Sequence, residues 1–144
     1  MDRPESIAAP PTPTLLAALL CDTAAVDRRS GKKGLLGICD TIMVSQFPAA
    51  RVFSLHLRIT GAEGTYEFQV KVVHRRTAAV ITRGRWHASV ADPLKGSDYT
   101  VDLPPLQLPE AGRDEFHLYA TTQCLGNATL DACGFPTTGE KETA

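Results

Sequence analysis

The most regular pattern in the chain is an alternation of apolar and polar residues with a period of two. Apolar side chains occupy every second position from 53 to 59, and the pattern recurs from 66 to 72. Successive side chains of a β-strand point to opposite faces, so each run predicts a strand with one buried face. Residues 61–64 begin and end with glycine, and we expect the two runs to pair there as a hairpin.

The same reading predicts strands in most of the remaining chain, and no segment sustains a helical period. Gly84 is expected to interrupt one of them, and Gly126-Asn127 suits a tight two-residue turn. Strands with one apolar face each must cover it with a second sheet. We therefore predict an all-β fold, an immunoglobulin-like antiparallel β-sandwich of about seven or eight strands. The further strands are expected at residues 15–22, 35–44, 78–90, 99–103, 115–123 and 128–135.

The 144 residues are expected to form one domain with two flexible ends. Residues 1–14 contain four prolines and little to bury, which predicts a flexible Pro-rich arm. Residues 15–135 form the predicted β-sandwich domain, and residues 136–144 a flexible tail.

Composition changes this picture little, because the net charge is -1 and 22% of the residues are charged. Such a balance is typical of a globular protein and provides no overall attraction to nucleic acid or membrane. The longest apolar run, Leu15 to Cys21, is too short to span a bilayer. Acidic residues and prolines precede that run, unlike a signal peptide, so we expect a cytoplasmic protein.

Three stretches resemble an uncharacterised bacterial family of small β-sandwich proteins, a domain of unknown function. They are LAALLCDTA from Leu16, GLLGICDTIMVSQFPA from Gly34, and LQLPEAGRDEFHLY from Leu106. The resemblance spans most of residues 15–133 and implies the fold but no activity. It implies that Asp22 and Asp40 occupy positions where the family usually has aspartate. At the positions of Cys21 and Cys39, in contrast, residues other than cysteine are common.

Two repeated Cys-Asp pairs, Cys21-Asp22 and Cys39-Asp40, suggest a metal or catalytic site at first sight. Adjacent residues of a strand point to opposite faces, so a pair cannot readily share one ion. If the first two strands form a hairpin around Ser30, both thiols share one face and both carboxylates the other. A disulfide between Cys21 and Cys39 is then possible in geometry, but a reducing cytosol argues against it.

The expected role of Asp22 and Asp40 is structural, because strand-end aspartates accept hydrogen bonds in the following turn. A bridge between Cys124 and Cys133 is not expected, since the predicted turn leaves these residues about 13 Å apart. Four histidines fall on four different predicted strands; His74, in the apolar phase at a strand end, is expected to be a satisfied boundary residue. No nucleophile elbow, metalloprotease helix or phosphate loop is present, so we predict no enzyme, no metal and no cofactor.

The strongest local charge signal is a basic predicted hairpin over residues 74–87. It contains Arg75, Arg76, Arg83, Arg85 and Trp86 and no acidic residue. An arginine-aromatic ribbon can bind phosphates or stack on bases, which makes these five residues the candidate binding residues. The arginines can equally protect an exposed strand edge from pairing with another chain.

Three functional hypotheses follow. The leading one is a non-catalytic interaction module that binds a partner protein or a second copy of itself, through strand-edge pairing. The alternative is an anionic-ligand or nucleic-acid binder that uses the hairpin at residues 74–87, although nucleic acid is not the expected partner of a slightly acidic chain. The weakest is a hydrolase or metal enzyme that uses Asp22 and Asp40.

Overall fold

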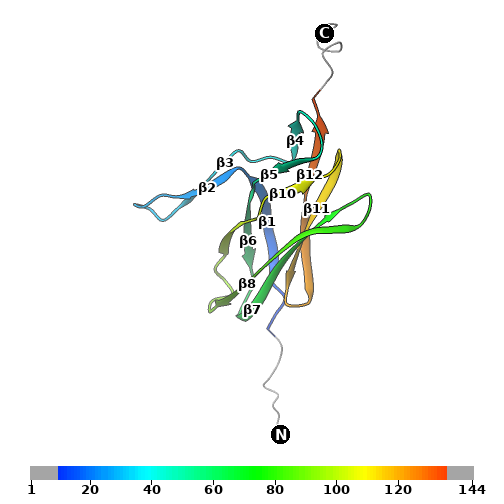
Figure 1. Cartoon of the computed structure of the whole chain (residues 1–144). Helices are drawn as coiled ribbons and strands as arrows, with labels where there is room; N and C mark the ends of the chain where they lie inside the picture. Colours follow the sequence, from blue (N-terminus) through cyan, green and yellow to red (C-terminus); the bar gives the residue numbers. More distant parts are fainter. Residues whose placement is uncertain (1–9, 136–144) are drawn as a thin grey trace.

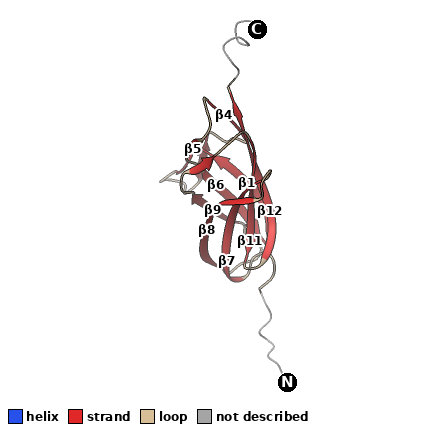
Figure 2. Cartoon of the chain, turned by 45° about the vertical axis from the view of Figure 1, so that its right-hand side comes forward, coloured by secondary structure: helices blue, strands red, loops and turns tan. Residues whose placement is uncertain are grey.

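The structure, a computed structural model, describes residues 10–135 and consists there of strands and loops (Figures 1 and 2). The arm at residues 1–9 and the tail at 136–144 lie outside the described residues. The strands are β1 (Thr14–Cys21), β2 (Thr23–Val26), β3 (Lys33–Leu36), β4 (Thr41–Val44), β5 (Ala49–Arg51), β6 (Ser54–Thr60), β7 (Gly64–His74), β8 (Ala79–Val90), β9 (Ser97–Asp102), β10 (Leu106–Leu108), β11 (Gly112–Ala120) and β12 (Gln123–Gly134).

Two sheets face each other in a sandwich-like arrangement. One has the order β1-β6-β9, and the other the order β4-β12-β11-β7-β8. Every pairing is antiparallel except that of β4 with β12. Two short ribbons, β2–β3 and β5–β10, complete the described fold. The all-β prediction is confirmed; the strands outnumber the predicted seven or eight because several are only three or four residues long, and the immunoglobulin-like label stays a prediction.

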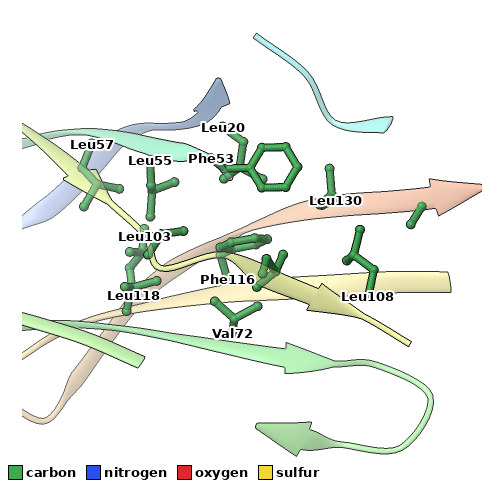
Figure 3. Close-up of a cluster of buried hydrophobic side chains, with 13 residues drawn as sticks. Leu20, Phe53, Leu55, Leu57, Val72, Leu103, Leu108, Phe116, Leu118 and Leu130 are labelled. Atoms are coloured by element: carbon green, nitrogen blue, oxygen red, sulfur yellow. The ribbon is translucent and has the colours of Figure 1, made fainter. Parts of the chain in front are cut away.

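The core lies between the two sheets and is built from the apolar faces that the period-two pattern predicts. In Figure 3, Leu55 and Leu57 of β6 point toward Phe116 and Leu118 of β11. Each of these four side chains is at most 3% exposed. Burial of such side chains contributes roughly 1.5–3 kcal/mol each, so this interface supplies most of the hydrophobic stabilisation.

The predicted hairpin between residues 53–60 and 66–72 is wrong. Strand β6 pairs with β1 and β9, whereas β7 pairs with β8 and β11. The chain crosses from one sheet to the other after Gly61, whose φ of 74° few other residues adopt. The two strands face each other across the core, and that arrangement produces the same alternation as a paired hairpin.

Two glycines have roles other than those predicted. Gly126 does not form the turn; it lies inside β12 at a register shift opposite Leu118, with its missing Cβ facing Leu15. The turn falls instead between Ala120 and Gln123. Gly84 does not interrupt β8, and its missing side chain lets the strand lie close to Val70.

The predicted strand at 35–44 is divided, and its parts belong to different sheets. Strand β3 pairs with β2 in a hairpin that projects from the side of the molecule (Figure 1), whereas β4 joins β12. Gly37, with a φ of 71°, lies between them. The turn predicted near Ser30 is confirmed, but it joins β2 to β3. Residues 15–22 pair with β6 instead, apart from one bridge that places Cys39 opposite Leu20 rather than Cys21.

Within residues 10–135 there is no helix long and apolar enough to cross a membrane.

Candidate binding groove

A groove with a cavity volume of about 610 Å³ runs along β9. Five consecutive residues of that strand, 98–102, line it. One wall is the β2–β3 hairpin, with residues 24–26 and Lys33, and the other is Arg85 and Trp86 of β8. Consecutive residues of a strand point to opposite faces, and the groove contacts all five. The groove therefore follows the edge of β9 rather than one of its faces. We call this the β9-edge groove.

The edge of β9 is open, because β9 is the last strand of its sheet. The Leu103 N–H donates to the Phe53 carbonyl (3.2 Å), which continues the β6–β9 register. Bonded and non-bonded pairs alternate in an antiparallel ladder. Residues 99 and 101 therefore direct their backbone groups toward β6, and residues 98, 100 and 102 direct theirs into the groove.

One outward backbone group already has a partner from the opposite wall. The Lys33 ammonium donates to the Asp98 carbonyl (3.2 Å), which agrees with the outward direction of that carbonyl. No hydrogen bond within residues 10–135 uses the outward backbone groups of Thr100 or Asp102. The groove therefore presents two donors and two acceptors in the spacing of a β-ladder.

The apolar wall consists of aromatic rings. The Trp86 ring lies 6.0 Å from that of Tyr99, and both lie within 5.5 Å of Phe68 between ring centroids. Trp86 and Tyr99 are half-buried, and the indole Nε1 of Trp86 has no hydrogen-bond partner among the described residues. Aromatic surface of this kind favours an apolar side chain that packs on it.

Charges of opposite sign lie at the two ends of the edge. At one end Asp98 forms an ion pair with Arg58 (2.9 Å), and the Lys33 ammonium lies against the same residue's backbone. At the other end Asp102 accepts a hydrogen bond from the Ser54 hydroxyl (2.7 Å) and has no cation within ion-pair distance among the described residues.

His56 lies between these ends, on the strand next to β9. It pairs with Thr100 across the ladder, and its side chain is 12% exposed. Burial lowers the pKa of His56, and the nearby Asp98 only partly opposes that effect. The middle of the edge is therefore uncharged at neutral pH.

Only two of the five predicted binding residues, Arg85 and Trp86, lie in the groove. They point to opposite faces of β8, so they do not form the expected arginine-aromatic ribbon. Arg75 and Arg76 lie at the tip of the β7–β8 hairpin, and Arg83 lies on the outer face of its sheet.

Acidic residues that are distant in sequence accompany three of the arginines. Arg76 forms an ion pair with Glu110, Arg75 lies 3.9 Å from Glu115, and Arg85 lies 3.7 Å from Glu67. Residues 74–87 contain no acid, but the earlier part of β7, the strand β11 and the loop before β11 supply these acidic side chains.

Asp22 and Asp40 are both exposed and lie next to backbone turns. The Asp22 carboxylate occupies the space where a side chain at position 37 would lie, and its backbone N–H donates to the Leu36 carbonyl (3.0 Å). Asp40 accepts a hydrogen bond from the Thr41 hydroxyl (3.3 Å). Their structural role stays a prediction, and no three metal-binding side chains within residues 10–135 are grouped around a common point.

The four cysteines are free thiols. Cys21 is fully buried, donates to the Ser54 carbonyl, and has its pKa raised by burial. Burial also raises the pKa of Cys39. Cys124 and Cys133 lie nine positions apart on β12, roughly 30 Å along a strand, which excludes a bridge between them.

A partly buried ionic cluster, which we call the His74 cluster, lies outside the groove. The Nδ1 atom of His74 lies 2.7 Å from Asp114, and Nε2 lies 3.0 Å from Glu110, which also binds Arg76. The hydrogen bonds to Asp114 and Glu110 raise the pKa of His74 above its usual range. The expectation of a satisfied boundary histidine is confirmed, although the pattern did not indicate its acidic partners.

Comparison with known proteins identifies the family but no activity. A family model described as a family of unknown function (DUF6941) matches residues 16–132, so the chain belongs to that family. No curated protein matches the chain.

Proposed function

We propose that this member of a family without an assigned activity is a non-catalytic interaction module, whose β9-edge groove binds an extended segment of a partner protein. The bound segment adds a strand to the β1-β6-β9 sheet. The single observation that carries this proposal is the open edge of β9 inside a groove, with the outward backbone groups of Thr100 and Asp102 free. Strand addition uses such groups for affinity and adjacent pockets for specificity.

The groove has the features that strand addition requires. Its volume of about 610 Å³ lies within the range of ligand sites. The rings of Trp86 and Tyr99 offer apolar surface to one face of an incoming strand. Another long edge strand, β8, carries Arg83, Arg85 and His87 on its exposed face, and charged side chains commonly protect an edge from pairing.

The alternative of an anion or nucleic-acid binder has weaker support, since Arg75, Arg76 and Arg85 each have an acidic neighbour. A location in the cytoplasm also remains our proposal.

The test uses one substitution that removes a groove donor without altering the β6–β9 ladder. The Thr100 N–H points away from β6, so Thr100→Pro removes it and places a ring on the edge while the ladder keeps its hydrogen bonds. Thr100→Val is the matched control, because it keeps the N–H and removes only a hydroxyl that has no partner in the described residues.

The probe is the uncharged peptide Ser-Thr-Leu-Thr-Leu-Thr-Ser, acetylated and amidated, titrated to millimolar concentration against labelled protein. In ¹⁵N–¹H spectra we expect shifts of the Thr100 and Asp102 amides and of the indole of Trp86, the single tryptophan of the chain. The Thr100→Val protein should respond equally, and the folded Thr100→Pro protein should not. Binding that is as strong in Thr100→Pro as in the natural protein would refute the proposal.

A further inference from the structure

The ends of the β9-edge groove differ in charge, and this difference identifies the chemistry of the segment that fits it. Two cations, Arg58 and Lys33, lie at the end marked by Asp98, which leaves one net positive charge there. The carboxylate of Asp102 gives the other end one net negative charge. Arg85 of the opposite wall lies 3.7 Å from the carboxylate of Glu67, so this pair adds no net charge to either end.

The geometry of β9 converts these two ends into a spacing along the partner. Asp98 and Asp102 are four residues apart, about 13 Å along a strand. Residues four apart in an added strand also share a face. The central position between them faces Thr100, and its neighbours on the other face of the strand meet the rings of Trp86 and Tyr99.

We infer that the occupant of the groove is a segment of another protein with opposite charges four residues apart and apolar residues between them. Its acidic residue lies at the Lys33 end, and its basic residue lies opposite Asp102. This inference rests on the proposed function, since it names the partner of the same edge. It adds that charge, and not only the backbone, selects the partner.

Lys33 has a defined part in this selection. In the free protein its ammonium binds the Asp98 carbonyl and so covers one acceptor of the open edge. When a strand pairs with that carbonyl, the ammonium turns to the acidic side chain of the incoming segment. If the partner has no acid at that position, the Lys33 ammonium gives up the Asp98 carbonyl without gaining an acidic side chain in exchange, and binding is weaker.

A second copy of the chain satisfies only half of this requirement, because its Asp102 supplies an acid at the Lys33 end but its Asp98, and not a basic residue, lies opposite Asp102. Antiparallel pairing of two β9 edges about Thr100 places Asp98 of one copy opposite Asp102 of the other. Like charges directly opposite each other destabilise a strand pair. The inference therefore commits to a foreign segment.

The test compares two peptides of identical composition, acetylated and amidated: Ser-Lys-Leu-Thr-Leu-Glu-Ser and Ser-Glu-Leu-Thr-Leu-Lys-Ser. Both carry leucines at the two positions that meet the aromatic rings. For a given strand direction, one order places the peptide's glutamate at the Lys33 end and its lysine opposite Asp102, and both contacts are favourable. The other order makes both contacts unfavourable. We expect about a tenfold difference in Kd at low salt, smaller at high salt. The preferred order also gives the strand direction, because a leading lysine opposite Asp102 means antiparallel addition.

The matched protein carries exchanged charges, Lys33→Glu with Asp102→Lys, and it should prefer the opposite order. If the double variant does not fold, Asp102→Asn keeps an acceptor for Ser54 and should lose most of the preference. Equal binding of both orders, or a preference that the exchange leaves unchanged, would overturn the inference.

The outcomes also separate this inference from the proposal on which it rests. Binding of the uncharged peptide without any order preference leaves the proposed function intact and overturns only the inference. Absence of binding by all three peptides overturns both. Dimerisation of the natural protein that is lost in Thr100→Pro, observed by analytical ultracentrifugation, would assign the edge to a second copy and overturn the inference.

Discussion

Substitution of the buried histidine, His74→Gln, is expected to lower the free energy of unfolding in a pH-dependent way. The His74 side chain is 4% exposed and that of Asp114 is 3% exposed. Both ring nitrogens face carboxylate oxygens, which only accept hydrogen bonds when they are ionised, so with Asp114 and Glu110 ionised the ring carries both protons and a positive charge. Removal of this cation leaves the Asp114 carboxylate buried without a counter-charge, which costs about 3–5 kcal/mol.

The sign of the pH dependence follows from the raised pKa of His74. The stabilisation is fully present below the unfolded pKa of about 6.5 and is lost as the pH rises through the folded value. Within that window the natural protein should lose about 1.4 kcal/mol per pH unit from this group. The cause is a neutral ring, which places an unprotonated nitrogen against a carboxylate oxygen.

Urea unfolding between pH 5 and pH 9, followed by Trp86 fluorescence, measures this effect as the difference between the natural protein and His74→Gln. His56 has a lowered pKa and the opposite effect, but it is present in both proteins and cancels. His87→Gln is the control, because His87 is 71% exposed on the neighbouring strand. A difference that stays constant or grows as the pH rises would refute the argument.

Three further measurements test other parts of the structure. Gly37→Ala should destabilise by roughly 2 kcal/mol or more, because it combines a positive φ with displacement of the Asp22 carboxylate; Gly31→Ala, at a similar φ in open space, should cost about 1 kcal/mol. Equal costs in urea unfolding would contradict the close approach of Asp22. A thiol reagent should modify two cysteines of the folded protein rapidly, the exposed Cys124 and Cys133, and all four after denaturation. Amide hydrogen exchange in the free protein should be fast at residues 100 and 102 and slow at 99 and 101; protection at all four positions would show that the edge is covered.

The buried faces were predictable from the sequence, and the sheet partners were not. Alternation at residues 53–59 identifies which side chains enter the core, because burial acts on each strand separately. It carries no information about which strand lies alongside. Strands β6 and β7 illustrate this, since each has one apolar face and they meet across the core rather than within a sheet. Glycine was ambiguous for a similar reason, because a positive φ at Gly126 serves a bulge as well as a turn.

The same limit explains why the groove was not predicted. Strands β8 and β9 both lie at sheet edges, and in both the charged residues follow a period of two. These residues are Arg83, Arg85 and His87 on β8 and Asp98 and Asp102 on β9, so the two edges look alike in sequence.

What distinguishes the two edges comes from elsewhere in the chain. Glu67 on β7 lies beside Arg85, whereas Lys33, on the β2–β3 hairpin 65 residues before Asp98, forms part of a wall beside β9. A charged period-two strand therefore identifies an edge candidate, but only the distant segments that pack beside it decide whether that edge is compensated or open to a partner.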